Sequence, residues 1–112
     1  MRKAILLVTT IAAAAVAAVP ALAATKTVKV GDNYFVRSSG TPTVTVKRGT
    51  KVTWVWRGVA PHNVTVTKGP KKFKSKTITK GTYSATPHTP GKYLVVCTIH
   101  QPDMKMKLRV TR

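Results

Sequence analysis

Residues 92–104 read KYLVVCTIHQPDM. The segment begins as a short apolar run, which is typical of a buried strand, and continues into a polar loop. Cys97, His100 and Met104 follow one another in that loop. A loop that turns between two strands can bring side chains at this spacing to one point. The segment therefore predicts a β-protein with sulfur and nitrogen ligand atoms clustered at the end of a strand.

The chain on either side of this segment has the alternating pattern of half-buried strands. Apolar and polar residues alternate, with many β-branched side chains, in residues 27–30, 43–47, 51–54, 63–66, 75–78, 92–96 and 106–110. Turns rich in glycine, proline and asparagine separate these runs. Seven or eight short strands at this spacing predict an all-β domain, either a Greek-key β-sandwich or a small Greek-key barrel.

The first 23 residues have the layout of a secretory signal peptide. Met1, Arg2 and Lys3 form a basic start, residues 4–19 are apolar, and small residues stand before a cleavage site after Ala23. An uncleaved membrane anchor is the alternative, but a proline beside the cleavage site favours removal. We therefore expect residues 1–23 to be a signal peptide and residues 24–112 to form one domain that is periplasmic, associated with the cell envelope, or secreted.

Cys97 is the only cysteine, so no disulfide can form within the chain. A single cysteine in an exported protein indicates an intermolecular bridge, a reactive thiol or a metal ligand. A thiolate and an imidazole bind copper tightly, and a thioether serves as a weak axial ligand. His62, between Pro61 and Asn63, is the best candidate for a further strong ligand. Two histidines, a cysteine and a methionine form the ligand set of an electron-transfer copper site.

Four segments carry a more specific pattern: GTKVTW at 49–54, PHNV at 61–64, PGKY at 90–93 and CTIH at 97–100. With these segments the chain resembles the cupredoxins, or type 1 (blue) copper proteins, especially the plastocyanin- and amicyanin-like group. The resemblance implies a cupredoxin-like Greek-key β-sandwich. It also implies one copper ion, cycling between Cu(I) and Cu(II), with four protein ligands: His62, Cys97, His100 and Met104.

The same resemblance assigns Asn63 a supporting role. Its side chain would tie the His62 loop to the ligand loop near Thr98, and its backbone N–H would donate to the Cys97 sulfur. Such outer contacts help to set the properties of a metal site.

Three features depart from the pattern of these relatives. Three residues separate His100 from Met104, and Met106 is a rival axial ligand, because alternation along a strand places it on the same face. Trp56 stands where relatives commonly have a polar residue, and Pro87 where they often have an aromatic one. The few acidic residues exclude the acidic docking patches of some relatives. We expect His88 to be a surface residue and not a ligand.

Basic residues dominate the charge of the chain. Its 20 Lys and Arg face only two acidic residues, Asp32 and Asp103, for a formal net charge of +18. Removal of Arg2 and Lys3 with the signal peptide would leave a net charge of +16. Such a field favours an acidic partner protein, anionic envelope polymers or lipid head groups. The lysines also suit solvated strand faces, where they protect edges from aggregation. No nucleic-acid motif accompanies the charge, so we expect no specific recognition of nucleic acid.

Together these features favour a small exported electron carrier over an enzyme. Two acidic residues and no glutamate argue against a paired-carboxylate mechanism. A Cys97–His100 nucleophile pair fits this loop less well than metal binding does. We expect a monomer that meets a redox partner with an acidic surface. Two alternatives stay open at this stage: a protein that stores or delivers copper in the envelope, and a metal-free basic module that binds anionic envelope polymers.

Overall fold

The alternating runs of the sequence form strands in which every second side chain is buried. In β3 (Thr43–Lys47) the two valines point inward and the other three side chains are exposed. In β8 (Lys105–Thr111) Met106, Leu108 and Val110 are buried. The computed structural model describes residues 24–112. Its other strands are β1 (Thr25–Gly31), β2 (Tyr34–Phe35), β4 (Lys51–Trp56), β5 (Thr65–Lys68), β6 (Thr82–Ala85) and β7 (Gly91–Val96).

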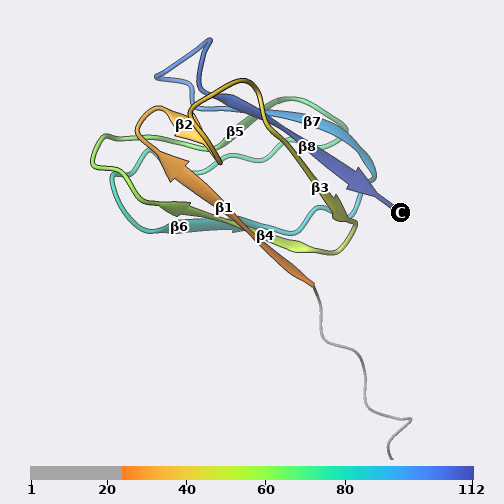
Figure 1. Ribbon diagram of the computed structural model, residues 1–112. Helices are drawn as coiled ribbons and strands as arrows, with labels where there is room; N and C mark the ends of the chain where they lie inside the picture. The colour runs from red at the N-terminus through yellow and green to blue at the C-terminus, as the bar shows by residue number, and fades with distance from the viewer. Residues whose placement is uncertain (1–23) are drawn as a thin grey trace, which may run out of the picture.

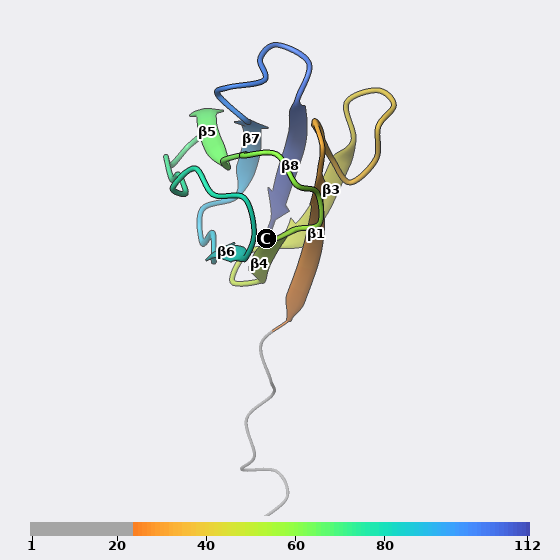
Figure 2. The ribbon, with the colours of Figure 1, turned by 90° about the vertical axis from the view of Figure 1, so that its left-hand side faces the viewer.

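These eight strands form two four-stranded sheets that pack face to face (Figures 1 and 2). The first sheet has the order β2-β1-β4-β6 and the second the order β3-β8-β7-β5. Strands β1 and β4 pair in parallel, as do β3 and β8, whereas β7 and β8 are antiparallel. The prediction of an all-β sandwich with seven to eight strands is therefore confirmed.

The core lies between the two sheets and includes several aromatic rings. Trp54 is fully buried, and its ring centroid lies 5.9 Å from those of Phe73 and Tyr83. Met106 and Leu108 fill the same layer from β8. Full burial of each large apolar side chain contributes about 1.5–3 kcal/mol to folding. This core provides a rigid base for the loops at the sandwich end, where the β7–β8 connection lies (Figure 2).

Two of the strand predictions were wrong: one strand does not form, and the other begins later than expected. Residues 75–78 do not form a strand, and their segment meets the neighbouring chain only through isolated bridges, Thr65–Lys74 and His62–Ile78. The reason is local: the Ser75 hydroxyl, instead of a backbone carbonyl, accepts the Val64 N–H at 2.8 Å, which interrupts a regular ladder. The strand expected at 63–66 begins later, at Thr65.

Strand β6 was missed by the sequence pattern. Its four residues include serine and alanine, which are weak strand formers. Pairing with β4 stabilises it, with Trp54 opposite Tyr83. Tertiary pairing therefore overrides the weak local preference.

The expected signal peptide, residues 1–23, lies outside the described part of the chain. Residues 24–112 include no helix of a length and apolar character sufficient to cross a membrane.

Candidate metal centre

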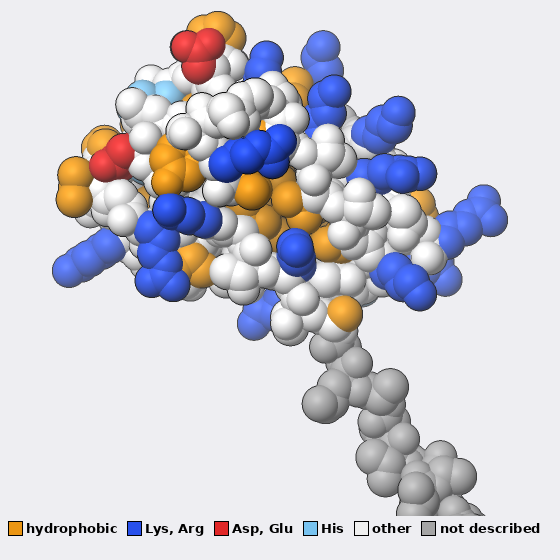
Figure 3. All heavy atoms as spheres, viewed as in Figure 1, with side chains coloured by type: hydrophobic (Ala, Val, Ile, Leu, Met, Phe, Trp, Pro, Cys, Tyr) orange, Lys and Arg blue, Asp and Glu red, His pale blue; other side chains and the backbone are white. Residues whose placement is uncertain are grey.

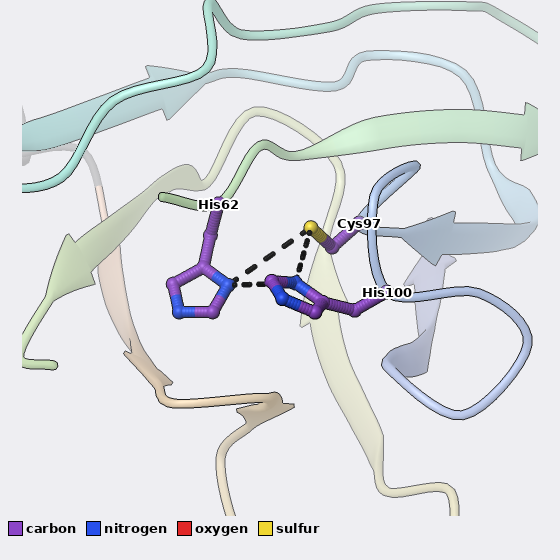
Figure 4. A group of neighbouring side chains, drawn as sticks. All are labelled: His62, Cys97 and His100. Atoms are coloured by element: carbon purple, nitrogen blue, oxygen red, sulfur yellow. Dashed lines mark hydrogen bonds between the residues drawn. The ribbon is translucent and has the colours of Figure 1, made fainter. Parts of the chain in front are cut away.

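Three side chains from two loops point toward one another at one end of the sandwich (Figure 4). The Nδ1 atoms of His62 and His100 lie 3.2 Å apart. The Sγ atom of Cys97 lies 3.4 Å from His100 Nδ1 and 4.0 Å from His62 Nδ1. Three strong ligand atoms that the sequence places up to 38 residues apart thus share one small space.

The β7–β8 loop places two of these residues. Cys97 directly follows β7, and the His100 N–H donates to the Cys97 carbonyl at 3.2 Å, which turns the chain back. The Met104 N–H donates to the His100 carbonyl and the Cys97 N–H to the Met104 carbonyl, both at 3.1 Å. The loop is therefore closed by its own backbone, and the Cys97 and His100 side chains face the same point.

His62 is held by a different set of contacts. It lies in the connection between β4 and β5, where its backbone exchanges two hydrogen bonds of 3.0 Å with Ile78. The indole N–H of Trp56 donates to the His62 carbonyl at 3.2 Å. The His62 side chain is fully buried, so neither its backbone nor its ring has room to turn.

The spacing of the three ligand atoms fits a transition-metal ion. An atom equidistant from them would lie roughly 2.1 Å from each, which matches the ~2.0–2.3 Å bonds of imidazole and thiolate ligands. Two imidazoles and one thiolate are a ligand set that favours copper in a trigonal site. The geometry and the donor chemistry therefore both fit a copper ion.

Comparison with known protein families agrees with this geometry. Residues 24–111 match the model of a family described as copper binding proteins, plastocyanin/azurin family. The chain belongs to this family. Copper is accordingly its cofactor, and His62, Cys97 and His100 form the potential site.

A curated relative also points to a small copper protein of this family. The chain is 39% identical over 74 residues to amicyanin-alpha of Methylorubrum extorquens. That match covers 62% of this chain and 61% of the relative, so the chain spans less than two thirds of the relative's length.

Solved structures with similar folds include a copper-containing protein of the same size and a much larger one. A Cu(I) amicyanin with a Met-to-Gln substitution has a TM-score of 0.64 and 31% identity, over 77% of this chain and 81% of that one. A copper-containing nitrite reductase from Thermus scotoductus has a TM-score of 0.66 and 26% identity. The similarity there covers 84% of this chain and 23% of the reductase.

Within this family fold, Asn63 ties the two ligand loops together, as the family resemblance implied. Its side-chain oxygen accepts the Thr98 N–H at 3.1 Å, and its amide donates to the Thr98 hydroxyl at 2.9 Å. The same side chain also bonds Thr77 and Thr65. The expected bond from the Asn63 backbone N–H to the Cys97 sulfur stays a prediction.

The two candidate axial methionines lie at different distances from the ligand loop, since Met104 directly precedes β8 and Met106 lies within it. Both side chains are fully buried. Met106 pairs with Val95, whereas Met104 lies beside Cys97, with which it shares a backbone hydrogen bond. Met106 is therefore about two residues, or ~6.8 Å, farther along the strand from the ligand loop.

Sequence reasoning missed Asp32, which contacts His62 directly. His62 Nε2 lies 2.9 Å from Asp32 Oδ1. This hydrogen bond, with those from the N–H groups of Val59 and Ala60, lowers the pKa of Asp32 to about 2. In the sequence, the Gly31-Asp32-Asn33 segment has only the composition of a turn between strands. The rarity of acidic residues was the available signal, because Asp32 is one of two in a strongly basic chain.

The remaining predicted residues lie where they do not contact the ligand atoms. His88 is exposed, as expected, and borders a surface hollow with Phe73 and Pro87. Pro87 is buried, and its carbonyl accepts the Gly49 N–H at 2.8 Å, so it supports a turn and not the metal centre.

Proposed function

We propose that this chain is a small electron carrier, and that it binds one copper ion through His62, Cys97 and His100 with Met104 as the axial ligand. The observation that carries the proposal is the close triangle of two Nδ1 atoms and one Sγ atom, in which only His100 is partly exposed. Bound copper would supply the one-electron couple between Cu(I) and Cu(II). The position of Met104 beside Cys97, at the level of the ligand loop, supports its axial role over Met106.

The surroundings of the triangle favour fast electron transfer because they resist rearrangement. The β7–β8 loop is closed by its own backbone hydrogen bonds, His62 is held by backbone bonds to Ile78, and the Asn63 side chain joins the two ligand loops. Ligands held in one geometry need little reorganisation when the charge of the metal changes. A carrier differs in this respect from a protein that must open to release its metal.

One ligand offers a route for the electron to the surface. His62 and Cys97 are fully buried, whereas His100 is partly exposed. Next to His100, the apolar side chain of Ile99 is 50% exposed, and a partner could pack against it without desolvating a charge. The proposed electron path therefore runs through the His100 ring, and the proposed activity is electron transfer and not catalysis.

Charge suggests the kind of partner. On the outer face of the second sheet Lys92 lies directly opposite Arg109, and Lys107 lies opposite Leu94. Lys68 joins them along a groove of about 550 Å³. We call Lys68, Lys92, Lys107 and Arg109 the basic sheet face. Like charges opposite one another are unfavourable unless an anion lies between them, so this face suits an acidic redox partner.

The acidic side chains are placed differently. In Figure 3 Lys and Arg spread over most of the visible face, whereas the acidic side chains lie toward the upper left, near histidine. The acidic side chains shown in this view therefore lie together at one side, whereas the positive charges are spread over the rest of the face. This asymmetry would orient an approaching acidic protein. As an alternative, the same positive charge would attract anionic envelope polymers or lipid head groups.

We further propose that the protein acts outside the cytoplasm, after removal of residues 1–23. The basic, apolar and small-residue order of that segment supports export. The mass of the mature protein, isolated from its native cells, tests this directly. A chain that starts at Met1 would contradict it.

Titration of the metal-free protein with Cu(II) tests the main proposal. We expect one equivalent to give an intense absorption near ~600 nm, typical of a thiolate bound in a trigonal copper site. Cys97→Ser should abolish the colour, because it removes the thiolate, while the matched control His88→Ala should keep it. A colourless wild-type complex would refute the proposal. Rapid loss of copper to a chelator without a reversible redox couple would indicate copper delivery instead.

A further inference from the structure

We propose that Asp32 is a positioning residue for the ligand His62, and that it lowers the reduction potential of the copper site by accepting the His62 Nε2–H hydrogen bond. This inference rests on the proposed ligand role of His62. It assigns a function to one of only two acidic side chains in the chain.

The geometry of the contact is tightly constrained. Asp32 Oδ1 lies 2.9 Å from His62 Nε2. The Val59 N–H donates to both carboxylate oxygens, at 3.0 and 3.1 Å, and the Ala60 N–H donates to Oδ1 at 3.0 Å. The loop that carries His62 therefore also holds the carboxylate, so ring and acceptor stay aligned.

The turn that carries Asp32 belongs to a different part of the sheet. Asp32 and Asn33 form the connection between β1 and β2, where Gly31 pairs with Tyr34. Asn33 has a φ of 85°, a conformation that asparagine tolerates better than most residues. The carboxylate thus reaches His62 from 30 residues away in sequence, so the contact is a tertiary one.

Gly58 gives an independent sign that space is reserved for this carboxylate. A Cβ atom at position 58 would collide with the Asp32 carboxylate group. The β4–β5 loop therefore requires glycine there if the Asp32 side chain is to reach His62. The close approach of loop and carboxylate is a built feature of the site.

The charge of the chain argues against a general surface role for Asp32. Within residues 24–112, His62 is the only basic side chain within ion-pair distance of an acidic one. Although Lys and Arg are abundant, the Asp32 carboxylate contacts a histidine ring and two backbone N–H groups. Its partners are those of a group that orients a loop and a ligand.

The chemical consequence follows from the two nitrogens of the ring. A proton held on Nε2 by the carboxylate leaves the Nδ1 lone pair free, and Nδ1 is the atom that faces Cys97 and His100. A carboxylate acceptor also makes the imidazole a stronger donor to the metal. A stronger donor favours the more highly charged Cu(II) state over Cu(I), which lowers the reduction potential.

Reduction potentials of Asp32→Asn, Asp32→Ala and the wild-type copper protein test this inference. In both Asp32 variants we expect the affinity for Cu(II) to fall about 10–100-fold, which is the usual effect of removing a hydrogen-bond partner of a metal ligand. Cu(I) affinity should fall less. Each tenfold difference between the two losses raises the potential by ~59 mV. Far-UV circular dichroism of each variant verifies folding.

Two matched variants separate this role from simple charge and from simple packing. Asp103→Asn removes the other acidic charge, from the ligand loop itself, and should move the potential much less than Asp32→Asn. Gly58→Ala keeps the carboxylate but displaces it, so it should raise the potential as Asp32→Asn does. Equal shifts for Asp32→Asn and Asp103→Asn would overturn the inference, because they would show a through-space effect of net charge.

A second measurement reads the ring directly. Nitrogen NMR of the Cu(I) and metal-free wild-type proteins should show the His62 proton on Nε2, and Asp32→Ala should mix the two tautomers in the metal-free protein. If the wild type shows a blue copper spectrum but neither potential nor tautomer responds to Asp32, this inference alone fails. If the wild type has no such spectrum, the proposed function fails first.

Discussion

At the scale of single residues, Asn63 joins parts of the site that no strand connects. Its side chain makes four hydrogen bonds, two of them to Thr98 in the ligand loop and one each to Thr65 and Thr77. Thr98 directly follows Cys97, so Asn63 controls the backbone beside the thiolate. A residue that does not bind the metal can therefore influence its potential.

We expect Asn63→Ala to keep copper binding but to shift the reduction potential and lower the free energy of unfolding by about 1–3 kcal/mol. The loss arises because the Thr98 N–H and the partly buried Thr65 hydroxyl lose their partner. Voltammetry and urea unfolding measure the two effects. Thr77→Val is the control, since it removes one bond away from Cys97 and should change stability only. An unchanged potential in Asn63→Ala would contradict the role.

Met104 offers a second test at this scale. Met104→Gln replaces a thioether with an amide oxygen at the proposed axial position and should keep copper while lowering the potential, because the harder ligand favours Cu(II). Met106→Leu is the control: it nearly conserves volume in the core, should cost less than about 1.5 kcal/mol, and should leave the potential unchanged. If only the change at Met106 moved the potential, the axial assignment would be reversed.

At the scale of elements, the segment between β5 and β6 is irregular but still supports the metal centre. Its Ile78 pairs with His62, and its Ser75 hydroxyl accepts the N–H of Val64, which is fully buried. The segment thus lies along the chain around His62 and Val64 like an edge strand, but a side-chain hydroxyl replaces one of the backbone acceptors. Its regularity is lower than that of β7 or β8, but its contacts with the site are direct.

We expect Ser75→Ala to lower the free energy of unfolding by about 1–3 kcal/mol, because the buried Val64 N–H loses its acceptor. Ser84→Ala is the matched control in β6, where the hydroxyl makes an exposed bond to Thr53 and its removal should cost less than about 0.5 kcal/mol. Thermal unfolding of the metal-free proteins measures both. Equal losses of stability in the two variants would show that the Ser75 bond to the Val64 N–H does not stabilise the fold more than an exposed bond does.

At the scale of the whole molecule, positive charge is unbalanced over one sheet. Lys92 and Arg109 face each other across β7 and β8, and the basic sheet face contains no acidic side chain. Repulsion there weakens the fold slightly and strengthens the long-range attraction for anions. The unfavourable pair suits a surface that is used for docking.

Lys92→Glu should therefore stabilise the fold by about 0.2–1 kcal/mol, because it creates an opposite-charge pair with Arg109. It should also slow oxidation of the reduced protein by anionic ferricyanide, and the difference should shrink as salt is added. Stopped-flow rates at several ionic strengths check this, with Lys26→Glu as a control for net charge alone. Identical effects of the two variants would place the steering in the overall charge and not in the basic sheet face.

The sequence alone determined the class of fold and the loop in which three of the four proposed ligands lie. Alternation of apolar and β-branched residues is a local signal, so the strands around Val44, Val52, Val95 and Leu108 could be predicted without coordinates. Cys97, His100 and Met104 were recognisable because they share one short loop. Their chemistry and spacing already indicate a metal.

Only the tertiary structure decided how that metal centre is supported. The contacts of Asp32, Trp56 and Ser75 join segments that are far apart or irregular, and such contacts leave no periodic signal in a sequence. Strand β6 likewise exists because β4 pairs with it. Local patterns encode which face of a strand is buried, whereas the partner of a buried polar atom depends on how the two sheets and their loops come together.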